Sequence, residues 1–180
     1  MKSQIVKSPE YQELASSPLF KLMVNSWMAF NDEYDRDVKK HISPALFDGC
    51  SQVLENMVVT PHYLASSCCG LTYEHIPEMK IGDLRTDSLL ESYKSQLKDF
   101  MKLWIRVKGP LNIVKDVMGE KYMQDNFSGS NHICEVCSKL YNTPEIVEKV
   151  KEKYENYIND IIFRFSTEFE IGRLPVKEVL

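Results

Sequence analysis

Five cysteines are the residues of this chain whose type and spacing could do chemistry: Cys50, Cys68, Cys69, Cys134 and Cys137. Two residues separate Cys134 from Cys137. This spacing lets two sulfurs turn toward one centre, as in zinc ribbons, iron–sulfur proteins and thiol redox motifs. A pair of ordinary buried thiols is the alternative for this motif taken alone. The CxxC therefore marks a candidate site but does not identify its chemistry.

The remaining cysteines flank a predicted β-hairpin. Residues 51–61 are strand-like and end at a proline, and a second short strand is predicted over residues 63–67. A hairpin brings its own ends together. Cys50, before the first strand, and Cys68, after the second, are therefore expected to be neighbours. With the distant CxxC they would complete a four-thiolate site, which suits zinc or an iron–sulfur cluster.

Several helices are expected around this site, because apolar residues recur at helical spacing. They are predicted over residues 17–30, 89–107, 110–118 and 144–169. Residues 71–83 and 121–131 are predicted as loops. The fold class is therefore α+β and mostly helical, with a small β-hairpin beside a cysteine-ligated cluster and several amphipathic helices packed around it. The predicted divisions are an N-terminal helical segment (1–47), a cluster-binding domain (48–143), and a C-terminal amphipathic helix with its tail (144–180).

Composition excludes some classes of function. The net charge of -4 argues against a nucleic-acid binder with a basic surface. No apolar run reaches the roughly 18 residues of a membrane span, and the first residues lack the apolar segment of a secretory signal. A cytoplasmic location is therefore predicted. In that compartment cysteines more often serve as metal ligands or reactive thiols than as disulfides.

The order and spacing of these motifs resemble the auxiliary-cluster region of radical S-adenosylmethionine proteins, of the SPASM or twitch type. That region runs from a cysteine through a strand to a V-x-P-D-G turn, and returns to a cysteine that is often doubled as CCG. Here Cys50 begins the segment, residues 59–61 match the entry to the turn, and Cys68-Cys69-Gly70 ends it. Tyr63 stands where the family has glycine.

Two later segments extend the resemblance. Residues 75–84, HIPEMKIGDL, are similar to the family's linker IPELKLGNL, which leads into a helix. Residues 132–137, HICEVC, are similar to the closing CxxC of the single-cluster version. The resemblance covers roughly residues 48–143, about half of the chain.

The resemblance implies a [4Fe–4S] cluster held by Cys50, Cys68, Cys134 and Cys137. Zinc and a [2Fe–2S] cluster remain alternatives for the metal. Cys69 is the substitute for Cys68 as the ligand from the return strand. Three histidines are substitute ligands or hydrogen-bond donors to the ligands, with ordinary surface residues as the simpler interpretation: His62, His75 and His132.

The sequence also departs from the family. It has no C-x-x-x-C-x-x-C motif, which in the family holds the cluster that cleaves S-adenosylmethionine, and no (β/α) repeat for the catalytic barrel. The chain is thus expected not to be catalytic alone, and to be an enzyme component only when paired with a catalytic core. Its predicted partners are such a core or a peptide or protein substrate, with roles in electron transfer or substrate positioning. Because His62-Tyr63 replaces Asp-Gly, the hairpin turn is expected to be built differently.

Three other interpretations remain. A zinc-stabilised helical interaction module without a redox role would use the helices predicted over 88–108 and 144–169 as its working surface. A degenerate fragment would bind no metal. A thioredoxin-like use of Cys134 and Cys137 is disfavoured, because the motif is not expected to open a helix after a first strand.

Overall fold

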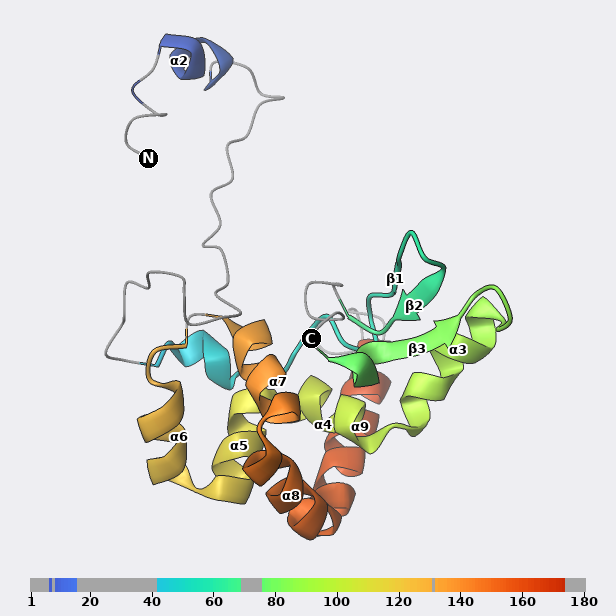
Figure 1. The fold of residues 1–180 in the computed structure, drawn as a ribbon, viewed down its shortest axis with the longest axis vertical. Coiled ribbons are helices and arrows are strands. Elements are labelled where there is room, and N and C mark those ends of the chain that lie inside the picture. The colour runs from blue at the N-terminus through green and yellow to red at the C-terminus, as the bar shows by residue number, and fades with distance from the viewer. Residues whose placement is uncertain (1–6, 8, 16–41, 69–75, 131, 174–180) are drawn as a thin grey trace.

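The fold is α+β and mostly helical, as the sequence predicts (Figure 1). It comes from a computed structural model that describes residues 7, 9–15, 42–68, 76–130 and 132–173. The α-helices are α2 (Pro9–Ala15), α3 (Leu89–Ser95), α4 (Phe100–Lys108), α5 (Pro110–Met118), α6 (Glu120–Phe127), α7 (Ile133–Asn142), α8 (Pro144–Lys153) and α9 (Ile158–Arg173). Short 3-10 helices are η1 (Pro44–Phe47), η2 (Pro77–Met79), η3 (Gln96–Lys98) and η4 (Tyr154–Tyr157). The helix predicted over residues 17–30 lies outside the described residues.

A small antiparallel sheet of three strands contains the predicted hairpin. Strand β1 (Val58–Val59) pairs with β2 (Leu64–Ser66), so the hairpin is confirmed. Its first strand is shorter than expected, because residues 51–55 form turns. On the other side of β2 lies β3 (Lys80–Asp83), in a segment predicted as loop. The prediction was wrong there because β3 is short and contains a glycine, which weakens a strand pattern.

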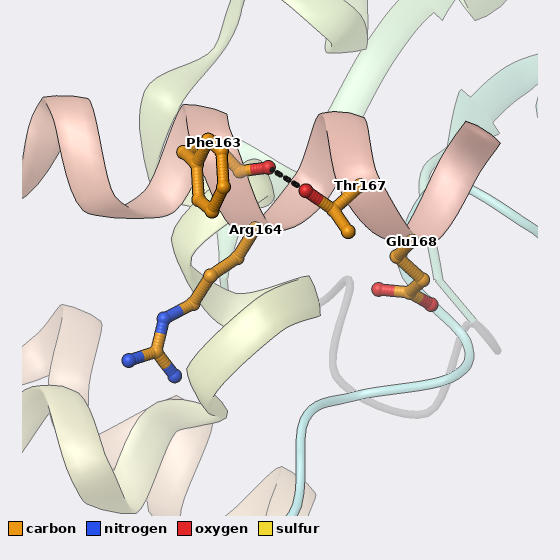
Figure 2. A pocket seen from close by; sticks show the side chains of 4 residues that line it. All are labelled: Phe163, Arg164, Thr167 and Glu168. Carbon is orange, nitrogen blue, oxygen red and sulfur yellow. Dashed lines mark hydrogen bonds between the residues drawn. The ribbon is translucent and has the colours of Figure 1, made fainter. Parts of the chain in front are cut away.

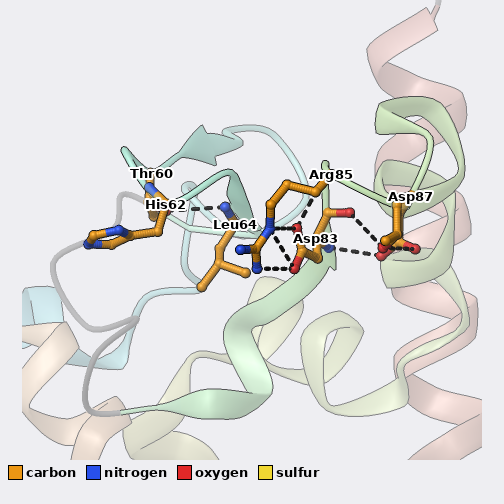
Figure 3. Close-up of polar contacts among 7 residues, drawn as sticks. Thr60, His62, Leu64, Asp83, Arg85 and Asp87 are labelled. Carbon is orange, nitrogen blue, oxygen red and sulfur yellow. Dashed lines mark hydrogen bonds and ion pairs between the residues drawn. The ribbon is translucent and has the colours of Figure 1, made fainter.

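The hairpin turn is closed by Thr60 and Tyr63. The amide of Tyr63 donates to the carbonyl of Thr60 (3.0 Å), and the Thr60 hydroxyl accepts the amide of Leu64 (3.2 Å; Figure 3). Tyr63 has a φ of 62°, the left-handed conformation that glycine adopts most easily. The expectation that this turn differs from the family's stays a prediction. Tyr63 itself adopts the positive-φ conformation and keeps its ring 60% exposed.

The helical predictions hold in part. Helix α5 runs from Pro110 to Met118 and ends at Gly119, as predicted. The helix predicted over residues 89–107 is divided instead into α3, η3 and α4. Its division occurs at Asp99, whose side chain accepts the amides of Met101 and Lys102 and so starts α4 as an N-cap. The C-terminal helix is likewise divided into α8, η4 and α9. Helix α6 lies where a polar loop was expected.

One hydrophobic cluster joins these elements. It reaches from Leu46 to Ile161 and includes residues on both sides of the predicted division at residues 143 and 144. Trp104 on α4 is fully buried and stacks on Tyr157 at 4.8 Å, where α9 begins. Helices α4 and α9 pack side by side, and the sheet with α3 lies at one edge of the helical part (Figure 1). In the described residues, no helix is long and apolar enough to cross a membrane. The predicted domain division stays a prediction.

Candidate functional site

Four cysteines from three separate segments line one small cavity: Cys50, Cys68, Cys134 and Cys137. Its volume is about 20 Å³. The rest of the wall is largely apolar and includes Val53, Met79 and Ile105. Cys68, Cys134 and Cys137 are buried, Cys50 is partly exposed, and none of the four is in a disulfide. The expectation that the hairpin brings Cys50 and Cys68 together is confirmed.

Cys50 is fixed by the end of α4. Its amide donates to the carbonyl of Ile105 over 3.0 Å. The preceding Gly49 lies directly against this helix end, since a β-carbon there would lie 2.2 Å from the carbonyl oxygen of Arg106. The side-chain amide of Asn112 on α5 donates to the Phe47 carbonyl at 2.6 Å. The segment before the hairpin is thus held by backbone contacts to two helices.

Cys68 is positioned by the pairing of β2 with the chain that follows η2. The amide of the neighbouring Ser67 donates to the Met79 carbonyl (2.9 Å), and the Ser67 hydroxyl donates to the same oxygen (3.3 Å). The Ser66 hydroxyl lies 3.7 Å from the Cys68 sulfur. Both serines are fully buried. These bonds to the end of η2 continue the pairing of β2 with β3, in which Ser66 lies opposite Lys80, so the strand that the sequence analysis missed helps to hold a predicted site residue.

Cys134 and Cys137 lie near the start of α7, three residues apart on one helix face. His132 caps this helix, and its Nδ1 accepts the amide of Cys134 at 3.2 Å. The CxxC thus opens a helix, but this helix follows α6 and not a first strand, as the sequence predicts. A helix start favours thiolates. The site nevertheless differs from a two-thiol redox motif, because Cys50 and Cys68 share its cavity.

Glu135 is a buried carboxylate between the two cysteines of the motif, 4% exposed. It accepts a hydrogen bond from the Ser130 hydroxyl (3.4 Å) and pairs with Lys139 (3.3 Å). The Lys139 ammonium also lies 5.3 Å from the centre of the Phe127 ring. These contacts tie the start of α7 to the end of α6. Sequence reasoning missed this residue, although an acidic residue in a first helical turn is a known signal of a helix start.

Tyr141 is a second residue of α7 that the sequence did not single out. Its hydroxyl is buried and has no hydrogen-bond partner among the described residues. Burial is the largest cause of a pKa for Tyr141 well above the usual range, and the charge of Cys137 is the next. Asp99, Glu78 and Cys68 raise that pKa further. The hydroxyl therefore lies in a buried environment that nearby anions influence.

The spacing of the thiols bears on which metal they could hold. Zinc bound by four thiolates needs sulfurs about 3.8 Å apart, because each Zn–S bond is about 2.3 Å and the geometry is tetrahedral. Within the described part of the chain, no group of three or more His, Cys, Asp or Glu side chains could hold a metal ion. The four thiols thus share a cavity without surrounding a single point. A cluster separates its ligands more widely, since each sulfur binds a different iron.

A larger pocket adjoins the cysteine cavity. Its volume is about 420 Å³, and Cys50, Gln52, Ile133 and Cys134 line both spaces. Asp48 and His132 add polar groups to its wall. The cavity itself is about the size that a single water needs, so a cluster would require its walls to separate. The edge formed by Cys50 and Cys134 is the side on which space is available.

Two of the other predicted ligands, His62 and His132, lie in the described part of the chain and do not line the cysteine cavity. His62 is exposed at the hairpin turn, where its amide donates to the Thr60 hydroxyl (3.3 Å; Figure 3). Cys69 and His75 lie outside the described residues, so Cys69 stays the predicted substitute for Cys68. His132 lines the larger pocket and serves α7 as its cap.

An ion pair stabilises the end of β3. The Arg85 side chain binds the Asp83 carboxylate, whose Oδ1 also accepts the Arg85 amide at 3.1 Å (Figure 3). These hydrogen bonds lower the pKa of Asp83 to about 2. Asp87 accepts the amide of Asp83 at 2.8 Å. The cluster closes the turn between β3 and α3 and takes no part in the cysteine cavity.

A separate hollow of about 390 Å³ lies on the surface of α9 (Figure 2). It is lined by Phe163, Arg164, Thr167 and Glu168, and the Thr167 hydroxyl donates to the Phe163 carbonyl at 2.8 Å. All these residues belong to one helix. The hollow is therefore a surface feature, with no second element in its lining that would fix a ligand.

Comparisons with known proteins identified no relative of this chain. No family model matches the chain, and neither the curated proteins nor the solved structures contain a match. The function of the chain is therefore inferred from its residues and their geometry.

Proposed function

We propose that this chain is an iron–sulfur cluster-binding auxiliary domain of the radical S-adenosylmethionine type. It supports electron transfer, or the positioning of a peptide or protein substrate, for a catalytic core that this chain lacks. One observation carries the proposal. Cys50, Cys68, Cys134 and Cys137 come from three distant segments and line the same cavity.

The donor set fits an iron–sulfur cluster. Four thiolates are the usual ligands of a [4Fe–4S] cluster, and here they would be Cys50, Cys68, Cys134 and Cys137. A bound cluster would supply one-electron redox chemistry. The protein would hold the ligands in a largely apolar wall, where burial influences the reduction potential. A [2Fe–2S] cluster remains an alternative with the same ligands.

The surroundings agree with this role. The larger pocket reaches the Cys50 and Cys134 edge, which gives a partner core or a peptide an approach to the site. Reduced thiols suit the cytoplasm, which is the location we propose. Because the ligands tie the hairpin to α7, metal binding would also stabilise the fold.

A series of single Cys→Ser variants tests the ligand set. Each protein is purified anaerobically, reconstituted with ferrous iron and sulfide, and assayed for iron, sulfide and visible absorbance. Serine at position 50, 68, 134 or 137 is expected to reduce cluster content strongly. Cys69→Ser is the matched control and is expected to bind as the wild type does. A Cys134→Ser protein with wild-type cluster content would refute the ligand set.

A zinc-stabilised interaction module is the second candidate. Large apolar side chains are exposed on the two helical surfaces proposed for it, with Leu90 on α3 58% exposed and Phe163 on α9 71% exposed. Exposed apolar groups of this kind are typical of binding surfaces when they are contiguous. Stoichiometric zinc without sulfide in the anaerobically purified protein would favour this candidate over the first.

A further inference from the structure

Tyr141 carries a buried polar atom that the described fold does not explain. Its hydroxyl is inaccessible to solvent and has no hydrogen-bond partner in the described part of the chain. A buried hydroxyl without a partner is unfavourable, because it has lost its bonds to water and gained none. Such groups in folded proteins call for a specific explanation, and a role beside a redox or ion-binding site is one.

Tyr141 lies near the cysteine site, because the charges of Cys137 and Cys68 both contribute to its raised pKa. Tyr141 follows Cys137 by four residues on α7 and so lies on the same helix face. Long helical side chains lean toward the N-terminus and cover the preceding turn, which here is the turn of Cys137. The ring packs against the hydrophobic cluster that contains both Cys68 and Cys137.

The chemistry of the sulfur decides whether the hydroxyl has a partner. A neutral thiol is a weak acceptor. A metal-bound thiolate is charged, and hydrogen bonds to charged acceptors are about twice as strong as neutral ones. The same hydroxyl is therefore unfavourable in the metal-free protein and favourable once the thiols become ligands.

We propose that Tyr141 is a positioning residue of the cysteine site, and that its hydroxyl donates a hydrogen bond to the thiolate of Cys137 when the site is loaded. The inference rests on the proposed function, since it requires a loaded site. It assigns Tyr141 two effects: it strengthens retention of the metal, and it stabilises the more negative, reduced state of a cluster.

The test compares Tyr141→Phe with Tyr157→Phe in the full chain. The control removes a hydroxyl that does have a partner, the carbonyl of Asp116 at 3.1 Å, and that lies outside the cavity lining. Thermal unfolding of the metal-free proteins is measured first. Tyr141→Phe is expected to unfold at the wild-type temperature or above, whereas Tyr157→Phe is expected to unfold below it.

The loaded proteins are then compared. Loss of a hydrogen bond to a ligand typically weakens metal binding by about 10- to 100-fold. Tyr141→Phe is thus expected to lose its cluster to a chelator about tenfold faster than the wild type, and to show a more negative reduction potential. Tyr157→Phe is expected to keep the wild-type potential.

The outcomes separate the two proposals. A wild-type protein that loads a cluster, with Tyr141→Phe unchanged in both retention and potential, would overturn the role of Tyr141 and leave the proposed function intact. A wild-type protein that takes up neither iron with sulfide nor zinc would overturn the proposed function and this inference together. A metal-free Tyr141→Phe protein that is markedly destabilised would show that its hydroxyl already has a partner, which also contradicts the inference.

Discussion

The amide of Cys50 lies 3.0 Å from the carbonyl oxygen of Ile105, to which it donates a hydrogen bond. This contact joins the segment before the hairpin to the last turn of α4. Both residues line the cysteine cavity. The position of the first predicted ligand is therefore set by backbone geometry as well as by side-chain packing.

Gly49→Ala tests that geometry. The added methyl group would lie 2.2 Å from the Arg106 carbonyl oxygen, so the backbone beside Cys50 must move. We expect a loss of about 2 kcal/mol in the free energy of unfolding, as for other overpacked sites, and faster loss of bound metal. Gly119→Ala is the control. Its φ of 93° makes alanine strained, but no atom lies within 4 Å of the new methyl group. Gly119→Ala should lower the free energy of unfolding without faster loss of metal. Equally fast metal loss from the two variants would show that the contact between Gly49 and α4 does not hold the site.

Tyr63→Gly tests the hairpin turn. A residue other than glycine is strained in the left-handed conformation by about 1–2 kcal/mol, and glycine removes this strain. Part of that gain is offset, because glycine loses more conformational entropy on folding. Because the ring of Tyr63 is 60% exposed, little packing is lost. We expect Tyr63→Gly to raise the free energy of unfolding by about 0.5 kcal/mol, measured by urea denaturation. Tyr63→Ala keeps the strain and should give no gain; an equal gain in the two variants would exclude the backbone explanation.

His132 distinguishes a helix cap from a metal ligand. Its Nδ1 accepts the amide of Cys134, so His132→Ala should reduce the free energy of unfolding by about 1 kcal/mol. Asparagine is a good cap, and His132→Asn should restore most of that loss while holding metal as the wild type does. If His132→Asn instead lost metal as severely as the cysteine variants, the imidazole would have to be counted among the ligands.

The ion pair at the end of β3 predicts a dependence on pH. Hydrogen bonds from Arg85 lower the pKa of Asp83 to about 2, from an ordinary value of 3.8. Since the folded pKa is the lower one, these bonds stabilise the fold fully above about pH 4, and the stabilisation is lost as the pH falls toward 2. Arg85→Gln removes the side-chain bonds, so the pKa of Asp83 measured by NMR should rise toward 3.8.

Lys98→Gln is the matched control for that titration, because it makes the same change of charge at another exposed residue. It should leave the Asp83 titration where it is in the wild type. A rise in the pKa of Asp83 that is as large in Lys98→Gln as in Arg85→Gln would mean that overall charge, and not the Arg85 contact, sets the value.

The elements with strong local signals could be predicted from the sequence. The hairpin, α5 with its proline start and glycine end, and the proline start of α8 appear where expected. The sequence predicts that Cys50 and Cys68 meet through the hairpin, whereas in the structure the hydrogen bond from Cys50 to Ile105 on α4 also fixes Cys50. These features depend on short-range chemistry, which a single sequence displays.

The missed elements depend on contacts between distant segments. Strand β3 pairs with β2, and its Gly82 lies against α3 so closely that a β-carbon would sit 2.1 Å from the Ser92 hydroxyl oxygen. Helix α6 is mostly polar, and its buried Met123 and Phe127 are the one weak sign of a helix there. The break at Asp99 interrupts a run whose apolar spacing continues through it. Tertiary packing decided the first two cases, whereas the break at Asp99 is local, because the Asp99 side chain caps α4.

The start of α7 is a different kind of miss. Ile133, Val136 and Leu140 have helical spacing, so the signal was present beside the cysteines. No helix is predicted there in the sequence analysis, because the cysteine spacing alone does not indicate one. In the structure both cysteines lie near the start of helix α7.

The central claim is that the four cysteines lining the cavity hold an iron–sulfur cluster. The most direct test is to purify the wild-type chain without oxygen, reconstitute it with iron and sulfide, and measure iron, sulfide and zinc together with the visible spectrum. We expect iron and sulfide in equal amounts, close to one [4Fe–4S] cluster per chain, with broad visible absorbance that bleaches on reduction. Stoichiometric zinc without sulfide would contradict it.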